Sequence, residues 1–188
     1  VADLEGKLPE QFPVDEAYDW QPLVPLSAAS ENGSKLTTGA DGVVLVSGDR
    51  PLTDTYTLTF DVDFRDISHL ALKVLTDPSL GGGGPGRTDH GNFMLTEFKA
   101  TVAALADPAS SKPLAFTASA DFSQEGFPAA NAVDGKPDTG WAIHGPAPWN
   151  VNRTLTLVPS PESLAAIGTG TQRVTVRLEQ NFGTNHLI

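Results

Sequence analysis

Strict alternation of apolar and polar side chains over 56–64 constrains the fold more than any other feature of the chain. The apolar members of this segment are Tyr56, Leu58, Phe60, Val62 and Phe64. Only threonine and aspartate separate them. Successive side chains of a β-strand point to opposite faces of a sheet, so a period of two predicts a strand with one buried and one solvated face.

Further apolar patterns predict strands along most of the chain. They cover 42–48, 70–74, 93–102, 114–118, 153–158 and 172–179. The first of these, an apolar run between two glycines, is expected to be buried, and the single helical turn that we predict covers 161–167. The 18 glycines and 15 prolines also favour short strands and turns over helices. The sequence therefore predicts an all-β protein, an antiparallel β-sandwich.

We expect a single domain, because a chain of 188 residues can bury a normal core. Residues 1–26 are predicted to form an extended arm that packs on the core, with Trp20 as its anchor. Residues 27–188 are predicted to form the sandwich, with a truncated C-terminal strand that starts near Asn185. Because the chain begins with Val1, we expect an excised or processed piece of a longer protein.

Two parts of the chain resemble each other weakly in the order of their strands. The matched pairs are 55–60 with 153–157, 69–75 with 173–179, and 91–95 with 183–187. The similarity predicts two similar halves, as a duplicated half-sandwich or as the two sheets of one jelly roll, unless it reflects strand composition alone.

Charge and cysteine content exclude several classes of function. The chain has 12 basic and 23 acidic residues and a net charge of −11, which argues against nucleic acid and anionic membranes as partners. It contains no cysteine, which excludes disulfides, thiol catalysis, Cys-ligated zinc and iron–sulfur clusters. No apolar run approaches the roughly 20 residues that a membrane span requires, so we expect none.

No arrangement of side chains points to an enzyme. The histidines His69, His90, His144 and His186 are far apart in the sequence and lack the spacing of zinc ligands. No nucleophile-elbow motif is present. The glycine-rich segment 80–92 lacks the Gly-Lys-Ser/Thr of a phosphate-binding loop and the glycine spacing of a dinucleotide fingerprint. We therefore expect a non-catalytic protein.

The segment 131–141, Asn-Ala-Val-Asp-Gly-Lys-Pro-Asp-Thr-Gly-Trp, is predicted to be an ordered loop. Asp-Gly and Pro-Asp-Thr-Gly are turn sequences, and no helix or long strand fits between them. Asp134, Asp138, Thr139 and backbone carbonyls offer hard oxygen atoms, of which Ca²⁺ collects about six to eight. A surface turn capped by carboxylates is the alternative that the spacing leaves open.

This loop resembles the signature loop of discoidin-type (factor V/VIII C-type) domains, which include many carbohydrate-binding modules. The resemblance implies a galactose-binding-like jelly roll with a structural Ca²⁺. The calcium ligands that it implies are Ala132, Asp134, Lys136 through its carbonyl, Thr139 and Glu97. Trp141 is implied to pack below the loop. In that family the glutamate follows the loop, whereas here it precedes it, which implies either a circularly permuted strand order or a chance similarity.

A second resemblance covers more of the chain. The segments 44–51, 75–87, 91–98 and 126–135 together resemble the uncharacterised all-β segment of large planctomycete-type extracellular proteins. Those proteins also carry an N-terminal cytochrome c domain, although the haem attachment motif is absent here. The resemblance implies a bacterial multidomain parent protein that is extracellular, at the cell surface or periplasmic.

Aromatic and polar residues in the two longest loops are candidates for binding a ligand. They are Arg87, Asp89, His90, Asn92, His144 and Trp149. Sugar recognition combines an aromatic platform with planar polar side chains. Trp149 is the best platform because no core strand fits its flanks, Pro148 and Asn150. Alternatively, Trp149 covers an end of the sandwich, while Arg87 and His90 close the glycine-rich loop onto the sheet.

These features together predict a non-catalytic module that binds a polysaccharide and is stabilised by Ca²⁺, within a larger exported protein. The alternative is a structural or protein-interaction domain that positions a neighbouring cytochrome c domain and other domains of the same parent chain. Glycan binding that is lost in Trp149→Ala would favour the first hypothesis, and binding to sibling domains without glycan binding would favour the second.

Overall fold

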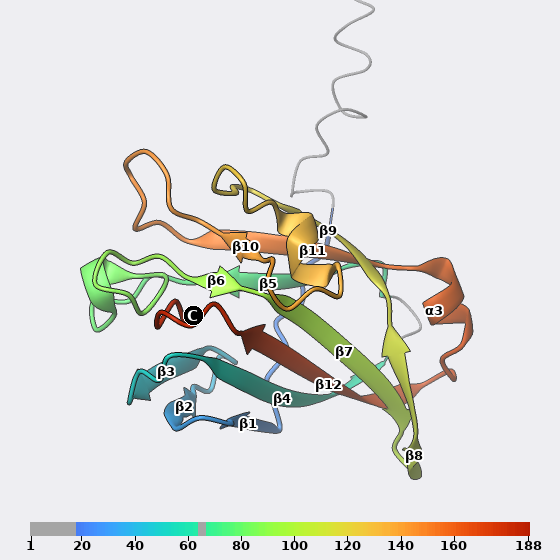
Figure 1. Cartoon of the computed structure of the whole chain (residues 1–188). Coiled ribbons are helices and arrows are strands. Elements are labelled where there is room, and N and C mark those ends of the chain that lie inside the picture. The colour runs from blue at the N-terminus through green and yellow to red at the C-terminus, as the bar shows by residue number, and fades with distance from the viewer. Residues whose placement is uncertain (1–17, 64–66) are drawn as a thin grey trace, which may run out of the picture.

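The computed structural model describes residues 18–63 and 67–188, whose strands form two layers around one core (Figure 1). The strands are β1 (Ser27–Ser30), β2 (Ser34–Thr38), β3 (Val44–Gly48), β4 (Asp54–Asp63), β5 (Leu70–Val74), β6 (Met94–Leu95), β7 (Glu97–Ala104), β8 (Asp107–Leu114), β9 (Phe116–Ala120), β10 (Trp141–Ala142), β11 (Arg153–Pro159) and β12 (Thr171–Gln180). The helical turns are the 3₁₀-helices η3 (Gly81–Gly83) and η4 (Ala129–Val133) and the α-helix α3 (Pro161–Ala165). No helix within the two described ranges is long and apolar enough to cross a membrane.

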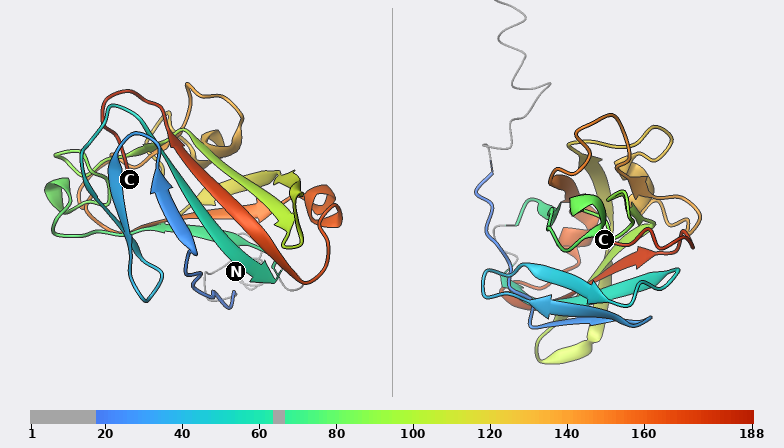
Figure 2. Two further views of the ribbon diagram at one scale, coloured as in Figure 1. Left: turned by 90° about the horizontal axis from the view of Figure 1, so that it is seen from below. Right: turned by 90° about the vertical axis from the view of Figure 1, so that its left-hand side faces the viewer.

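The described strands pair antiparallel and form two main sheets. The larger sheet has the order β1-β4-β12-β7-β8, and the smaller sheet has the order β5-β11-β9. Two short pairs, β2-β3 and β10-β6, complete the fold. Figure 2 shows the two layers from two further sides. The protein is therefore an all-β, antiparallel sandwich, as the sequence predicts.

β12 lies at the centre of the larger sheet, between β4 and β7. Val174 and Leu178 point into the core and are almost completely buried. Arg173, on the opposite face, forms an ion pair with Asp61 of β4, which is its partner in the register. The period of two over 172–179 therefore separates the core from solvent, as predicted.

The core between the sheets consists mainly of aliphatic and aromatic side chains. Leu155 and Leu157 of β11 are fully buried and belong to one cluster with Phe98 and Val102 of β7. Complete burial of a leucine side chain contributes about 1.5–3 kcal/mol relative to exposure. Because β11 lies between β5 and β9, both of its neighbours help to exclude water from this cluster.

Some predicted strands differ from the observed ones. The strand predicted over 93–102 is divided into β6 and β7 at Thr96, whose hydroxyl and backbone N–H both donate to the Glu179 carbonyl. The sequence did not predict β8, because this edge strand is mostly polar and contains two prolines, which only an edge strand tolerates. β3 is less buried than predicted, with Leu45 37% exposed, because it pairs only with β2.

The two ends of the chain differ from the expectation in detail. Residues 1–17 of the predicted arm, like Phe64 of the alternating segment, lie outside the described residues. The rest of the arm leads into β1, and Trp20 contacts the ring of Tyr18 at 5.5 Å between ring centroids. Residues 181–188 follow β12 without forming a strand of their own.

Candidate functional site

Three segments that are far apart in the sequence meet at one end of the sandwich, which we call the loop end (Figure 1). They are the glycine-rich loop 80–92, the loop 143–152 and the C-terminal segment 181–188. The first and third are joined by a backbone hydrogen bond, in which Arg87 N donates to Leu187 O at 2.8 Å. Leu187 is completely buried, so the C-terminal segment is fixed against the sandwich.

The glycines of the loop 80–92 permit close approach of backbone to backbone. A Cβ atom on Gly81 would lie 2.0 Å from Thr88 O, and one on Gly86 would lie 2.1 Å from Asn92 O. Any side chain at these positions would therefore displace the opposite side of the loop. Compact folding of the loop on itself explains its glycine content.

Two of the predicted ligand-binding residues lie inside the protein. Arg87 is 4% exposed, and its guanidinium donates to Ser34 Oγ and to Gly48 O, both at 2.9 Å. Asn92 is also buried, and its side-chain oxygen accepts a hydrogen bond from Ile143 N at 3.1 Å. Both side chains hold the glycine-rich loop to its neighbours, which matches the structural alternative for Arg87. We therefore leave Arg87 and Asn92 out of the candidate ligand site.

Asp89 lies at the margin of the loop end. Its side chain is 90% exposed and forms an ion pair with Arg50 Nη1 at 3.0 Å. Arg50 also donates to Arg87 O at 2.6 Å, so the pair fixes the glycine-rich loop from outside. An exposed pair of this kind contributes little to stability and leaves the Asp89 carboxylate accessible.

The other predicted ligand-binding residues come together in a continuous series of rings, which we call the aromatic strip. It consists of Trp149, His144, His90, His186 and Phe182, and successive ring centroids are 5.7, 5.4, 5.7 and 5.3 Å apart. Trp149 is stacked on His144 with an angle of 20° between the ring planes. Trp149 and Phe182, at the two ends of the strip, are 42% and 46% exposed. The strip therefore presents aromatic surface to solvent along the loop end.

His186 and Phe182 belong to the strip but were not predicted as binding residues. Burial lowers the pKa of His186, and the nearby His90 and His144 lower it further, although a hydrogen bond to the Thr184 carbonyl acts in the opposite direction. The weak match of 183–187 with 91–95 was the only sequence signal that connected the C-terminal segment with the glycine-rich loop.

The predicted calcium loop 131–141 begins with η4 and ends with β10. Asp134 accepts hydrogen bonds from the Thr139 hydroxyl and from Lys136 N, all at 2.9 Å. Burial alone would raise the pKa of Asp134, but these hydrogen bonds and the Lys136 charge lower it overall. The carbonyl of Lys136 accepts from the Thr139 hydroxyl at 3.1 Å. The oxygen atoms of three predicted ligands therefore already lie together.

Trp141, the last residue of this loop, belongs to the hydrophobic core. Its side chain is fully buried, its Nε1–H donates to Phe122 O at 2.9 Å, and its ring contacts that of Phe93. Trp141 pairs with Leu95 in the β10-β6 ladder. The end of the loop is therefore held against β6.

Glu97, the fifth predicted calcium ligand, lies next to the loop. It is 3% exposed, and its Oε1 has no hydrogen-bond partner. Burial raises the pKa of Glu97, and the charges of Asp134 and Glu179 also raise it, while Lys99 and a hydrogen bond from Gly135 N lower it. A buried carboxylate oxygen without a donor, close to a second carboxylate, is an arrangement that a bound cation would stabilise.

The donor set around Glu97 suits a hard cation. It combines two carboxylates with hydroxyl and backbone oxygens, the ligand types that Ca²⁺ prefers. Among the described residues, no group of three or more His, Asp or Glu side chains could hold a metal ion. The residues whose oxygen atoms lie close together here are Asp134, Lys136 and Thr139, with Glu97 next to them.

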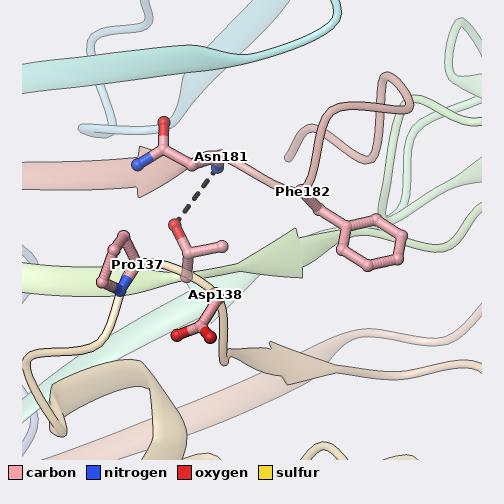
Figure 3. A pocket seen from close by; sticks show the side chains of 5 residues that line it. Pro137, Asp138, Asn181 and Phe182 are labelled. Carbon is pink, nitrogen blue, oxygen red and sulfur yellow. Dashed lines mark hydrogen bonds between the residues drawn. The ribbon is translucent and has the colours of Figure 1, made fainter.

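A hollow of about 290 Å³ lies between the 131–141 loop and the end of β12 (Figure 3). Its lining residues are Thr96, Pro137, Asp138, Asn181 and Phe182. Thr96 fixes the hollow, because its hydroxyl donates to Glu179 O and accepts from Asn181 N at 3.1 Å. Phe182 belongs both to the hollow and to the aromatic strip, so the two surfaces are continuous.

No protein-family model matches this chain, and comparisons with curated proteins and with solved structures give no significant match. Its function is therefore inferred from the geometry of the loop end and of the 131–141 loop.

Proposed function

We propose that the protein is a non-catalytic carbohydrate-binding module that binds polysaccharide at the aromatic strip. The observation that carries the proposal is the position of Trp149, which is 42% exposed on a loop and stacked on His144. Trp149 is not isolated, because the rings of the strip continue from it to Phe182, and a contiguous exposed apolar surface is a mark of a ligand-binding site. The apolar C–H face of a sugar ring fits such a surface.

Polar groups next to the strip would complete sugar recognition. Asp89 offers an exposed carboxylate at its margin, and the imidazoles of His90 and His144 can donate and accept hydrogen bonds to hydroxyl groups. This combination of aromatic surface with a few polar groups is typical of sites for small, uncharged, hydroxylated ligands.

We also propose that the domain is a discoidin-like, galactose-binding-type jelly roll with a structural Ca²⁺ in the 131–141 loop. The proximity of Glu97 to Asp134 supports the calcium site. The two-sheet architecture supports the jelly roll, and the arrangement of the matched strands is compatible with two similar halves. β4 and β11 each occupy an interior position in their sheet, where β4 pairs with β12 and β11 pairs with β5.

In this proposal the module belongs to a larger exported bacterial protein, located outside the cell, at its surface or in the periplasm. A role in attachment would place the parent protein on a polysaccharide while its other domains, such as a cytochrome c domain, carry out their own functions.

Affinity electrophoresis in gels that contain soluble polysaccharides tests the proposal. We expect the wild-type protein to be retarded by at least one polysaccharide, Trp149→Ala to migrate freely and Trp149→Phe to be partly retarded, because the ring is retained. Leu105→Ala serves as a control, since Leu105 is a 46% exposed apolar residue in the turn between β7 and β8. Retardation that is equal for wild type and Trp149→Ala would refute the role of the strip.

A structural or protein-interaction role is the second candidate function, and exposed apolar residues favour it. They lie in the segment before β1 and on or next to β3, and they are Leu23, Val24, Leu26, Val43 and Leu45. The two groups adjoin, because the Leu23 carbonyl lies 2.8 Å from where a Cβ atom on Gly42 would be. Binding of sibling domains to the wild type, lost in Val24→Ser and accompanied by no polysaccharide binding, would support this role instead.

A further inference from the structure

We propose that the hollow beside Phe182 is a second sugar subsite, so that the module binds an extended, uncharged polysaccharide chain and not a single sugar. This inference rests on the proposed carbohydrate-binding function. It adds a second binding position, a ligand length and a ligand charge. Each of these follows from a different property of the described residues.

The second position follows from the lining of the hollow. Phe182 supplies an aromatic ring that is 46% exposed, and Asp138 and Asn181 supply a planar carboxylate and a planar amide. The side chains of Asp138 and Asn181 are both exposed, and neither forms a hydrogen bond with another residue in the described parts of the chain. An acceptor, an amide and a ring around one hollow reproduce the chemistry that recognises a sugar ring and its hydroxyl groups.

The shape of the hollow is fixed by its surroundings. Asn181 N is hydrogen-bonded to Thr96 Oγ1, and Thr96 itself is completely buried at the junction of β6 and β7. Pro137 and Asp138 are held from the other side by the hydrogen bonds between Asp134 and Thr139. A site that is formed before the ligand arrives loses less conformational entropy on binding.

The ligand length follows from the continuity of the aromatic strip. Between Trp149 and Phe182 the rings of His144, His90 and His186 follow one another without a gap larger than 5.7 Å between centroids. A chain that rests on Trp149 at one end can therefore remain in contact with ring surface until it reaches Phe182. Simultaneous contact at both ends makes the second contact intramolecular and raises affinity without any change in either site.

The ligand charge follows from the carboxylate that lines the hollow and from the charge of the whole chain. Asp138 lines the hollow directly, and the chain has a net charge of −11. Uronate or sulfate groups would be repelled by this negative charge. An uncharged chain can instead donate its hydroxyl groups to Asp138.

The test compares ligand lengths in solution by isothermal titration calorimetry. Soluble galactan, mannan, xylan and mixed-linkage β-glucan are screened first, with polygalacturonate as the charged probe. The disaccharide and the hexasaccharide of whichever polysaccharide binds are then titrated into the wild type, Phe182→Ala, Asp138→Ala and the control Leu105→Ala. Melting curves establish that each variant is folded, and Asp138→Ala, on an exposed turn, remains informative if Phe182→Ala unfolds.

We expect the wild type to bind the hexasaccharide more tightly than the disaccharide. Phe182→Ala should weaken hexasaccharide binding by roughly three- to tenfold, as the loss of one aromatic contact predicts, and should weaken disaccharide binding less than hexasaccharide binding. Trp149→Ala should weaken binding of both. Equal hexasaccharide affinity in wild type, Phe182→Ala and Asp138→Ala would overturn the second subsite while the proposed function stands, and tighter binding of polygalacturonate would overturn the charge assignment. Absence of binding to every polysaccharide would refute the proposed function itself.

Discussion

Replacing Glu97 by glutamine should reveal whether the 131–141 loop binds calcium. Glu97 is 3% exposed and its Oε1 has no partner, while burial and the charges of Asp134 and Glu179 raise its pKa. Without a cation, the ionised carboxylate is therefore unfavourable in the folded protein. Glu97→Gln preserves the shape of the side chain and removes the charge. We expect the metal-free variant to be at least as stable as the metal-free wild type at pH 7.

Added Ca²⁺ should make the wild type more stable than Glu97→Gln. An ion that binds only the folded state stabilises it by about 2.7 kcal/mol when its free concentration is a hundred times the dissociation constant. For a chain of this length, that free energy raises the melting temperature by about 5–10 °C. The wild type should show this rise between EDTA and excess Ca²⁺, measured by differential scanning calorimetry. Glu97→Gln and Asp134→Ala should show little of it, because each loses a carboxylate ligand.

The pH dependence gives a second measurement with a defined sign. A carboxyl group whose pKa is raised in the folded state destabilises the protein at high pH, and this penalty disappears as the pH falls towards the unfolded value of about 4.3. The metal-free wild type should therefore gain stability relative to Glu97→Gln between pH 7 and about pH 4.5. With Ca²⁺ present, acidification should instead lower the stability of the wild type relative to Glu97→Gln. Protons compete with the ion for Glu97, so the calcium-dependent rise in melting temperature shrinks as the pH falls.

Two results would refute this reasoning. One is a melting temperature of the wild type that is the same in EDTA and in excess Ca²⁺. The other is a calcium-dependent rise of equal size in wild type, Glu97→Gln and Asp134→Ala, which would place the ion elsewhere. Glu162→Gln is the matched control, because Glu162 is an exposed glutamate in the first turn of α3. It should retain the full calcium response.

Further predictions concern the core, a buried aspartate and the aromatic strip. Leu155→Ala should lower the free energy of unfolding, measured in urea, by about 2–5 kcal/mol, because Leu155 is completely buried between the sheets. Val158→Ala, on the same strand, should have a much smaller effect because Val158 is 37% exposed. Burial alone would raise the pKa of Asp54, but hydrogen bonds from neighbouring hydroxyl and backbone N–H groups lower it overall. The contribution of Asp54 to the free energy of unfolding should therefore be present above about pH 4 and be lost as the pH falls further. Asp54→Asn should accordingly lower stability at pH 7 by about 1–3 kcal/mol and flatten the acid limb of the stability profile. His186 should titrate below the usual histidine value of about 6.5 in an NMR pH titration, because burial and two neighbouring histidines lower its pKa; an unshifted titration would contradict the packing of the strip.

The sequence predicted most of the sheet strands because they alternate strictly. β4, β5, β11 and β12 carry one apolar and one polar face, and such a pattern depends only on local order. It failed for β8, whose polar residues and prolines belong to an edge strand, and for β1, whose four residues are small. Edge strands need not bury a continuous apolar face, so their position is decided by the pairing partner and not by their own composition.

The candidate site was only partly predictable, because its residues belong to segments that meet through the fold. His90, His144 and Trp149 carried a local signal, as polar or aromatic residues in long loops. His186 and Phe182 did not, because their segment carried no distinct pattern and its position depends on backbone hydrogen bonds to the glycine-rich loop and β6. Arg87 was predicted as a planar polar residue of a long loop, with closure of the glycine-rich loop as the alternative, and the fold shows that its guanidinium is buried against Ser34.

The proximity of Glu97 to the 131–141 loop has a simple cause in the strand register. β10 pairs with β6 so that Trp141, the last residue of the loop, lies opposite Leu95. Gly140 approaches β6 so closely that a Cβ atom would lie 2.7 Å from Leu95 O, which fixes this register. Glu97 is only two residues beyond Leu95, so the pairing brings it to the loop although it precedes the loop by many residues in the chain. The order of ligands along a sequence is therefore a weak criterion for such a site, because a cation requires only that the oxygen atoms meet in space, and an antiparallel pair can supply them from either direction.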